Sequence, residues 1–160
     1  MPRDNPPKTA IRSVLRDRLA QFDRRNSIRV RGIPKCEDVS SPEDTDQTVI
    51  DLDTTLRLNI TSIDIANCDR DILVKFVKFE NNIKFKKARM SLKAKKPGVY
   101  INEYLTKHRV HLFALARRLK REKVILDTWT KTGAIFVNLR NGEIKKIVSD
   151  EMLHNLCDNL

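Results

Sequence analysis

Residues 27–33 read SIRVRGI, a stretch in which apolar and basic side chains alternate. Ile28 and Val30 fall on one side of such a segment, and Arg29 and Arg31 fall on the other. This period of two is typical of a β-strand with one buried face. The stretch therefore predicts a strand that turns its apolar side toward a core and its arginines outward.

The segments after this strand alternate between helix and strand patterns. A helix is predicted to begin at Ser41, with serine as the cap, proline in the first helical position and two acids in the first turn. The other predicted elements are strands at 60–66 and 71–77 joined by a turn at 67–70, a helix at 81–92 weakly patterned by Ile83 and Met90, and a strand at 99–102. The order βαββαβ across 27–102 predicts a split βαβ sheet, antiparallel, with both helices on one face.

The flanking segments add a short helix before this domain and a small domain after it. Residues 8–24 predict a helix with one apolar stripe of Ile11, Leu15, Leu19 and Phe22, too short for a stable coiled coil alone. It either docks on the body or ends a longer stalk, and we expect a monomer or a weak homo-oligomer. The later pattern predicts a basic helix capped by Thr106, a hairpin of 124–130 and 134–139 around 131–133, a strand at 143–148 and a helix after Ser149. We expect an α+β protein in three parts: an arm at 1–26, the split βαβ domain at 27–102 and a small α-β-hairpin-α domain at 103–160.

Charge is strongly segregated along the chain. Residues 83–131 contain 15 Lys or Arg and 3 Asp or Glu, a net charge of +12 that exceeds the +11 of the whole 160-residue chain, whereas 34–82 are acidic. Within the basic segment, Leu112, Leu115, Ala116 and Leu119 recur at helical spacing, which indicates a folded helix rather than a basic tail. A fixed cationic surface attracts polyanions. The alternative is a solvated lysine-rich surface.

The C-terminal part also carries a recognisable motif. Residues 100–120 (YINEYLTKHRVHLFALARRLK) and 129–137 (WTKTGAIFV) resemble the C-terminal domain of baculovirus few-polyhedra proteins. They are similar as well to first-open-reading-frame proteins of insect LINE-type retrotransposons, in which an RNA-recognition-motif (RRM)-like domain precedes this region. The resemblance covers about 40 residues closely and the segment upstream more loosely. It implies an RRM-like βαββαβ domain, single-stranded nucleic-acid binding with chaperone activity, or a viral role in polyhedron formation and virion occlusion. The sequence departs from the resemblance in two features: only residues 8–24 correspond to the long coiled coil of both groups, and we expect no zinc finger of the kind found at the N-terminus of some insect relatives.

These patterns place the expected binding site in a cleft between the two domains. The (Lys/Arg)-Gly-aromatic run of most RRMs is missing, so we expect weak base stacking on the first sheet and contacts from its arginines instead. A cationic groove with a few aromatic rings is the general solution for single strands. The expected site residues are Arg29, Arg31, Lys107, Arg109, Arg117, Lys120, Arg121, Trp129 and Lys131. Trp129 has the alternative of a half-buried hairpin aromatic, and Arg109 that of a partner for Glu103.

No catalytic or metal-binding pattern is visible in the sequence. The acids are too few near the cationic segment for a metal-dependent nuclease, and the pairs His154/Cys157 and His108/His111 each lack further ligands nearby. We therefore expect no enzyme activity, no metal and no cofactor. The apolar runs are too short for a membrane span, and no signal peptide is visible, so we expect an intracellular protein of the nucleus or cytoplasm.

Two functions remain open from the sequence. The first is sequence-tolerant binding of single-stranded RNA or DNA, with annealing activity, by a protein of viral or retroelement origin. The second is a viral structural or assembly role through protein partners or membrane surfaces.

Overall fold

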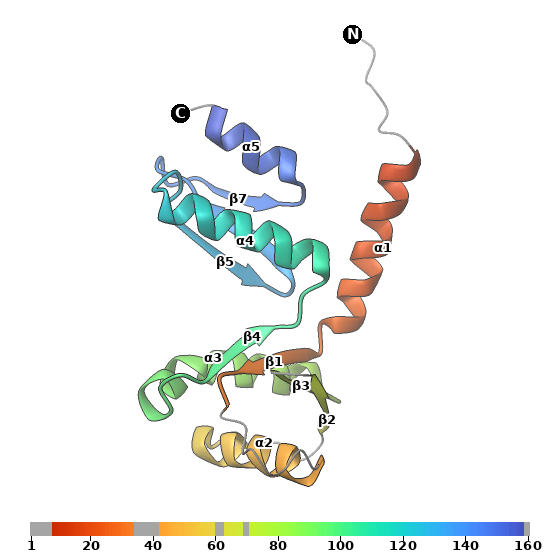
Figure 1. Ribbon diagram of the computed structural model, residues 1–160, viewed down its shortest axis with the longest axis vertical. Coiled ribbons are helices and arrows are strands. Elements are labelled where there is room, and N and C mark those ends of the chain that lie inside the picture. The colour runs from red at the N-terminus through yellow and green to blue at the C-terminus, as the bar shows by residue number, and fades with distance from the viewer. Residues whose placement is uncertain (1–7, 34–41, 60–62, 69–70, 159–160) are drawn as a thin grey trace. The chain divides into compact units, whose positions relative to one another are not determined.

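The computed structural model describes residues 8–33, 42–59, 63–68 and 71–158. The chain forms two compact units, one of Arg25–Tyr104 and one that combines Met1–Arg24 with Leu105–Leu160. The helix expected as a separate N-terminal arm therefore belongs with the C-terminal domain. Figure 1 shows the helices and strands of both units.

The unit 25–104 has the expected βαββαβ order. Its elements are β1 (Ser27–Arg31), α2 (Pro42–Leu56), β2 (Ile63–Cys68), β3 (Asp71–Phe76), α3 (Phe79–Lys95) and β4 (Tyr100–Glu103). The strands form one antiparallel sheet in the order β2-β3-β1-β4, which confirms the split βαβ arrangement. The cap expected at Ser41 lies outside the described residues, as does part of the turn expected at 67–70.

The core of this unit lies between one face of the sheet and the two helices. Ile28 stands opposite Val74, and Val30 stands between Ile72 and Ile101, so these apolar side chains share a face. They are buried against Val49, Leu52 and Leu56 of α2 and Phe85 and Leu92 of α3. Hydrophobic burial on one face explains why both helices lie on the same side.

Two details of this unit differ from or extend the sequence prediction. Met90 is 73% exposed, and Phe85 and Leu92 rather than Ile83 and Met90 define the buried side of α3. Gly32 has a φ of +81°, and a Cβ there would lie 1.8 Å from the carbonyl oxygen of Gly98. Only glycine fits this close approach at the end of β1.

The second unit contains α1 (Lys8–Arg24), α4 (Lys107–Arg121), β5 (Asp127–Lys131), β6 (Ala134–Asn138), β7 (Ile144–Ile147) and α5 (Asp150–Asp158). The three strands form an antiparallel sheet in the order β5-β6-β7. Leu112, Ala116 and Leu119 of α4 pack with Leu153 of α5 on one face of this sheet, where the buried strand residues are Ile135, Val137 and Ile147. Thr106 caps α4 as expected, since its side-chain oxygen accepts a hydrogen bond from the Arg109 N–H at 3.3 Å.

Helix α1 is attached to this unit by its polar side. Arg24 Nη1 donates to the carbonyl oxygen of Leu105 at 2.9 Å, and Gln21 Oε1 accepts from the Thr106 N–H at 3.0 Å. The apolar stripe predicted on α1 points elsewhere and is exposed, with Leu19 at 68% and Phe22 at 57%. The stripe is therefore no part of the core of this unit.

Candidate functional site

The solvent side of α4 carries the densest described group of cations. Its opposite side is fixed in the core by Leu112, Ala116 and Leu119, so the helix cannot turn its charged side inward. The exposed basic residues of α4 are Lys107, Arg117, Arg118, Lys120 and Arg121. The expectation of a folded cationic surface is met by this geometry, because an amphipathic helix holds these charges in place.

Arg117 and Arg121, like Lys107, have no acidic partner among the described residues, and they lie in the densest part of this surface. The guanidinium carbon of Arg117 lies 4.9 Å from the centroid of the Phe113 ring, in the geometry of a cation–π contact. Neither Arg117 nor Arg121 forms an ion pair with an acid of the described residues. The ring orients Arg117 while the polar edge of its guanidinium stays available to a ligand.

Arg118 and Lys120, by contrast, are engaged with acids. Arg118 Nε lies 2.7 Å from Glu122 Oε1, and Lys120 Nζ lies 2.5 Å from Asp127 Oδ1. The hydrogen bonds from Lys120 and from the Thr128 N–H lower the pKa of Asp127 below its ordinary value of 3.8, so Asp127 is ionised at neutral pH. Both cations contribute less net positive potential than Arg117 and Arg121.

Arg109 has a structural role that the sequence did not predict. Its Nε donates to Asp17 Oδ2 of α1 at 2.8 Å, and its Nη1 donates to the carbonyl oxygen of Gly133 at 2.7 Å. The alternative partner expected for Arg109 was Glu103, which instead binds Lys86 Nζ at 2.7 Å. Arg109 thus joins α1, α4 and the β5–β6 turn.

The carboxylate of Asp17 is the centre of this attachment. Burial raises its pKa, but hydrogen bonds from Thr106 and Arg109 and the positive charges of Arg109 and His108 outweigh burial and lower the pKa below 3.8. Asp17 therefore stays ionised at neutral pH. Asp17 is one of two acids in this basic helix, and the sequence contains no signal that sets its role apart from that of Asp23.

Trp129 and Lys131 do not stand beside the α4 surface. Trp129 is paired with Phe136 across β5 and β6, while the buried Ile135 and Val137 face α4. Because neighbouring residues of a strand point to opposite faces, Trp129 and Phe136 lie on the face of the sheet away from α4. Their rings stack with centroids 5.9 Å apart and planes at 14°, and Trp129 is half-buried. The expected wall of α4 and Trp129 around one groove is not formed within this unit.

The open face of the other sheet holds Arg29 and Arg31. Both point away from the core, as predicted, and both approach Asp71 of the neighbouring strand. Arg31 Nε lies 3.0 Å and Arg29 Nε 3.4 Å from Asp71 Oδ2. The Arg29 guanidinium also lies 5.3 Å from the centroid of the Tyr104 ring. A carboxylate thus already occupies the position from which these arginines would bind an anion.

The nine predicted site residues therefore fall into separate groups. Lys107, Arg117, Lys120 and Arg121 lie on α4, Trp129 and Lys131 on the outer face of the C-terminal sheet, and Arg29 and Arg31 on the open face of the first sheet. Arg109 is part of the α1 attachment. The cleft expected between the two domains stays a prediction.

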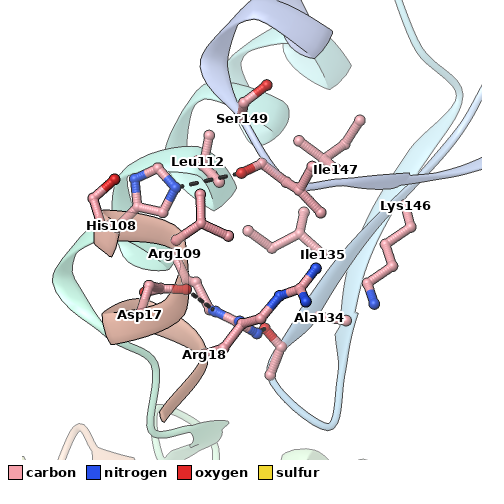
Figure 2. A pocket seen from close by; sticks show the side chains of 14 residues that line it. Asp17, Arg18, His108, Arg109, Leu112, Ala134, Ile135, Lys146, Ile147 and Ser149 are labelled. Atoms are coloured by element: carbon pink, nitrogen blue, oxygen red, sulfur yellow. Dashed lines mark hydrogen bonds and ion pairs between the residues drawn. The ribbon is translucent and has the colours of Figure 1, made fainter. Parts of the chain in front are cut away.

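The second unit also contains a pocket of about 800 Å³. It lies between α1, the first turns of α4, the β5–β6 turn and the end of β7 (Figure 2). Arg18 of α1 and Lys146 of β7 are among its lining residues, and the apolar lining includes Val14, Leu112 and Ile135. The sequence alone gave no indication of this pocket, because its lining comes from four segments that are distant along the chain.

Among the described residues, no three side chains of His, Cys, Asp or Glu gather into a possible metal site. Within the same part of the chain, none of the helices combines the length and apolar composition of a membrane span.

Comparison with known proteins identifies no family for this chain. No protein-family model matches the chain, and no curated protein matches it significantly. The resemblance to few-polyhedra and retrotransposon proteins therefore remains a prediction from the motif.

Proposed function

We propose that this protein binds single-stranded RNA or DNA with little sequence preference, with strand annealing as an associated activity. The observation that supports this most is the pair Arg117 and Arg121. They lie on the solvent side of a helix whose other side is buried, without a described carboxylate partner. Arginine binds phosphate through a planar fork and stacks on bases, which suits a flexible strand better than a rigid duplex.

The weak sequence preference follows from the open face of the first sheet. The positions that would offer stacking rings on β1 hold Arg29 and Arg31, and the facing strand holds Leu73 and Lys75. Tyr100, opposite Arg31, is the exposed ring on β4. Phosphate contacts position a strand but carry no sequence information. The motif resemblance supports the same function and a viral or retroelement origin.

The direct test is filter binding of the full chain to single-stranded RNA, single-stranded DNA and heparin. Engagement of about five phosphates predicts a log–log slope of affinity against salt of about −3.5. We expect both strands to bind more tightly than heparin of equal charge, because stacking adds to the electrostatic attraction. A response that is flat between low and physiological salt would contradict the proposal.

A second candidate function rests on α1. Its exposed apolar residues, which include Ile11, Leu15, Leu19 and Phe22, lie on a helix that also carries several arginines. A basic amphipathic helix of this kind suits an assembly protein that binds a protein partner or an anionic membrane surface. Leu19→Glu should abolish such binding to vesicles with anionic lipid and leave oligonucleotide binding unchanged. Loss of oligonucleotide binding instead would place the apolar stripe of α1 in the nucleic-acid interface.

A further inference from the structure

The pocket of the second unit combines an apolar lining with cations. Leu112 and Ile135, which are both buried in the core, line the pocket from below, and Val14 and Val148 add half-exposed apolar surface. Its volume of about 800 Å³ lies within the range of pockets that hold small ligands. An apolar lining of this size favours a flat or compact apolar group over a bare ion.

Arg18 and Lys146 supply the charge of the pocket. Arg18 comes from α1 and Lys146 from β7, and both belong to the lining drawn in Figure 2. Both are exposed, and neither forms an ion pair with an acid of the described residues. The acid of the lining, Asp17, is already neutralised by Arg109 and hydrogen-bonded by Thr106. The pocket therefore presents uncompensated positive charge beside an apolar surface.

We propose that this pocket receives one nucleotide of a bound single strand. The base would lie against the exposed side chains of Val14 and Val148, above the buried Ile135, and its phosphate would be bound by Arg18 and Lys146. A nucleotide fits because it joins a flat, weakly polar ring to a dianionic or monoanionic phosphate, the two features that the lining complements. This inference rests on the proposed function and adds a defined subsite to it.

The first experiment uses the full chain labelled at its isoleucine, leucine and valine methyl groups. Adenosine 5′-monophosphate is titrated in, with adenosine and inorganic phosphate as separate arms. We expect the nucleotide to shift the methyl signals of Ile135, Val14 and Val148, and each half-ligand to shift them several-fold less at equal concentration. Ile28 and Val74, in the core of the other unit, serve as internal references.

The second experiment uses matched variants of α1 and β7. Arg18→Ala and Lys146→Ala should each weaken the nucleotide titration about tenfold, and the double variant should bind a single-stranded oligonucleotide about tenfold less tightly. Arg16→Ala removes another exposed arginine of α1 that does not line the pocket, and this variant should bind as the unmodified chain does. Circular dichroism verifies that all variants remain folded.

The outcomes separate this inference from the proposed function. If the nucleotide leaves the pocket methyls unshifted while the chain binds oligonucleotides, the pocket is not a subsite and the proposed function stands. If inorganic phosphate alone reproduces the shifts, the site is an anion site without base recognition, which overturns the inference. If the unmodified chain binds no oligonucleotide, both fail. Equal losses for Arg16→Ala and Arg18→Ala would show that only total charge matters and would also overturn it.

Discussion

Asp17 and Arg109 are 92 residues apart in the sequence, yet the Arg109 Nε donates to Asp17 Oδ2 at 2.8 Å. Both side chains are more than four-fifths buried. The same arginine binds the Gly133 carbonyl, and Gly133 has a φ of +77° and no room for a Cβ beside Gln21. Thr106, Arg109 and Gly133, which belong to the C-terminal motif, therefore attach α1 to the C-terminal sheet.

This ion pair should matter for stability. Arg109→Ala removes the pair and leaves Asp17 partly buried without its cation, so we expect the free energy of unfolding to fall by about 1–3 kcal/mol. Urea denaturation measures the loss. Arg118→Ala is the matched control, because its exposed pair with Glu122 is worth about 0.3–0.5 kcal/mol. Equal losses for the two variants would contradict the structural role of Arg109.

The sequence predicts the regular part of this fold well because the regular part depends on local periodicity. The alternation at Ile28 and Val30 and the cap at Thr106 are signals within a few residues, and the elements that they predict are present. The attachment of α1 has no such signal, since it depends on which polar side chains meet across 92 residues. The periodicity of α1 predicted an apolar stripe and left open whether the helix docks, whereas the docked side is the polar row of Asp17, Gln21 and Arg24 at i, i+4 and i+7.

The same limit applies to the candidate site. Helical periodicity was sufficient to place Arg117 and Arg121 on the solvent side of α4, but it does not reveal which cations find acids. Lys120 and Arg31 are exposed basic residues like Arg121, yet each is paired with a carboxylate. Lys120 of α4 contacts Asp127 of β5, and Arg31 of β1 contacts Asp71 of β3. Likewise Trp129 is a hairpin aromatic as expected, but the strand register alone decides that it faces away from α4.

The attachment of α1 should depend on acid pH. The folded-state pKa of Asp17 lies below its ordinary value of 3.8, so its ionised form stabilises the folded state at neutral pH. That contribution is present above about pH 4 and is lost as the pH falls through the lowered pKa. Hydrogen exchange of the α1 amides, compared at pH 6, 4 and 3, should therefore speed up at the acid end beyond the intrinsic change. Asp17→Asn should exchange faster at pH 6 and show little further loss. A pH response in this variant equal to that of the unmodified chain would assign the effect to other acids, such as Asp127.

Arg117 and Arg118 should differ in oligonucleotide binding although they are neighbours. Arg117 forms no ion pair with an acid of the described residues, and the Phe113 ring orients its guanidinium. Arg118, by contrast, is paired with Glu122. Arg117→Ala should weaken single-strand binding by about 1–3 kcal/mol, and Arg118→Ala by less. Filter binding gives both values, and circular dichroism should show an intact fold. Equal losses would mean that total charge alone governs binding.

Removing Asp71 should strengthen binding rather than weaken it. Its carboxylate competes with phosphate for Arg29 and Arg31, and an asparagine would keep a similar shape without the charge. Because such exposed pairs are worth up to about 1 kcal/mol, Asp71→Asn should raise the affinity for a single strand by up to about fivefold. Asp51→Asn, on the exposed side of α2, gives the same change in net charge and should raise it less. No difference between the two variants would show that the open face of this sheet is not in contact with the strand.

The oligomeric state tests the apolar stripe of α1. A helix of 17 residues holds little more than two heptads, too few for a stable coiled coil alone. Sedimentation velocity at micromolar concentration should show a monomer or a weak dimer, and Leu19→Glu should shift any dimer to monomer. A stable trimer would contradict this expectation.

The hydrogen bond from Arg24 to Leu105 has a consequence for folding cooperativity. The chain leaves one unit after Arg24 and returns at Leu105, and between them β1 and β4 are adjacent strands of the other unit. While that sheet is formed, the pairing of β1 with β4 keeps the end of α1 and the start of the C-terminal segment close together, as a very short linker would. When the sheet unfolds, α1 must find α4 across a loop of roughly 80 residues, about four doublings of length, at an entropic cost of about 2.4 kcal/mol. The two units are thereby coupled through chain connectivity, so that a destabilising substitution in the core of the inserted domain lowers the melting temperature of the unit into which it is inserted.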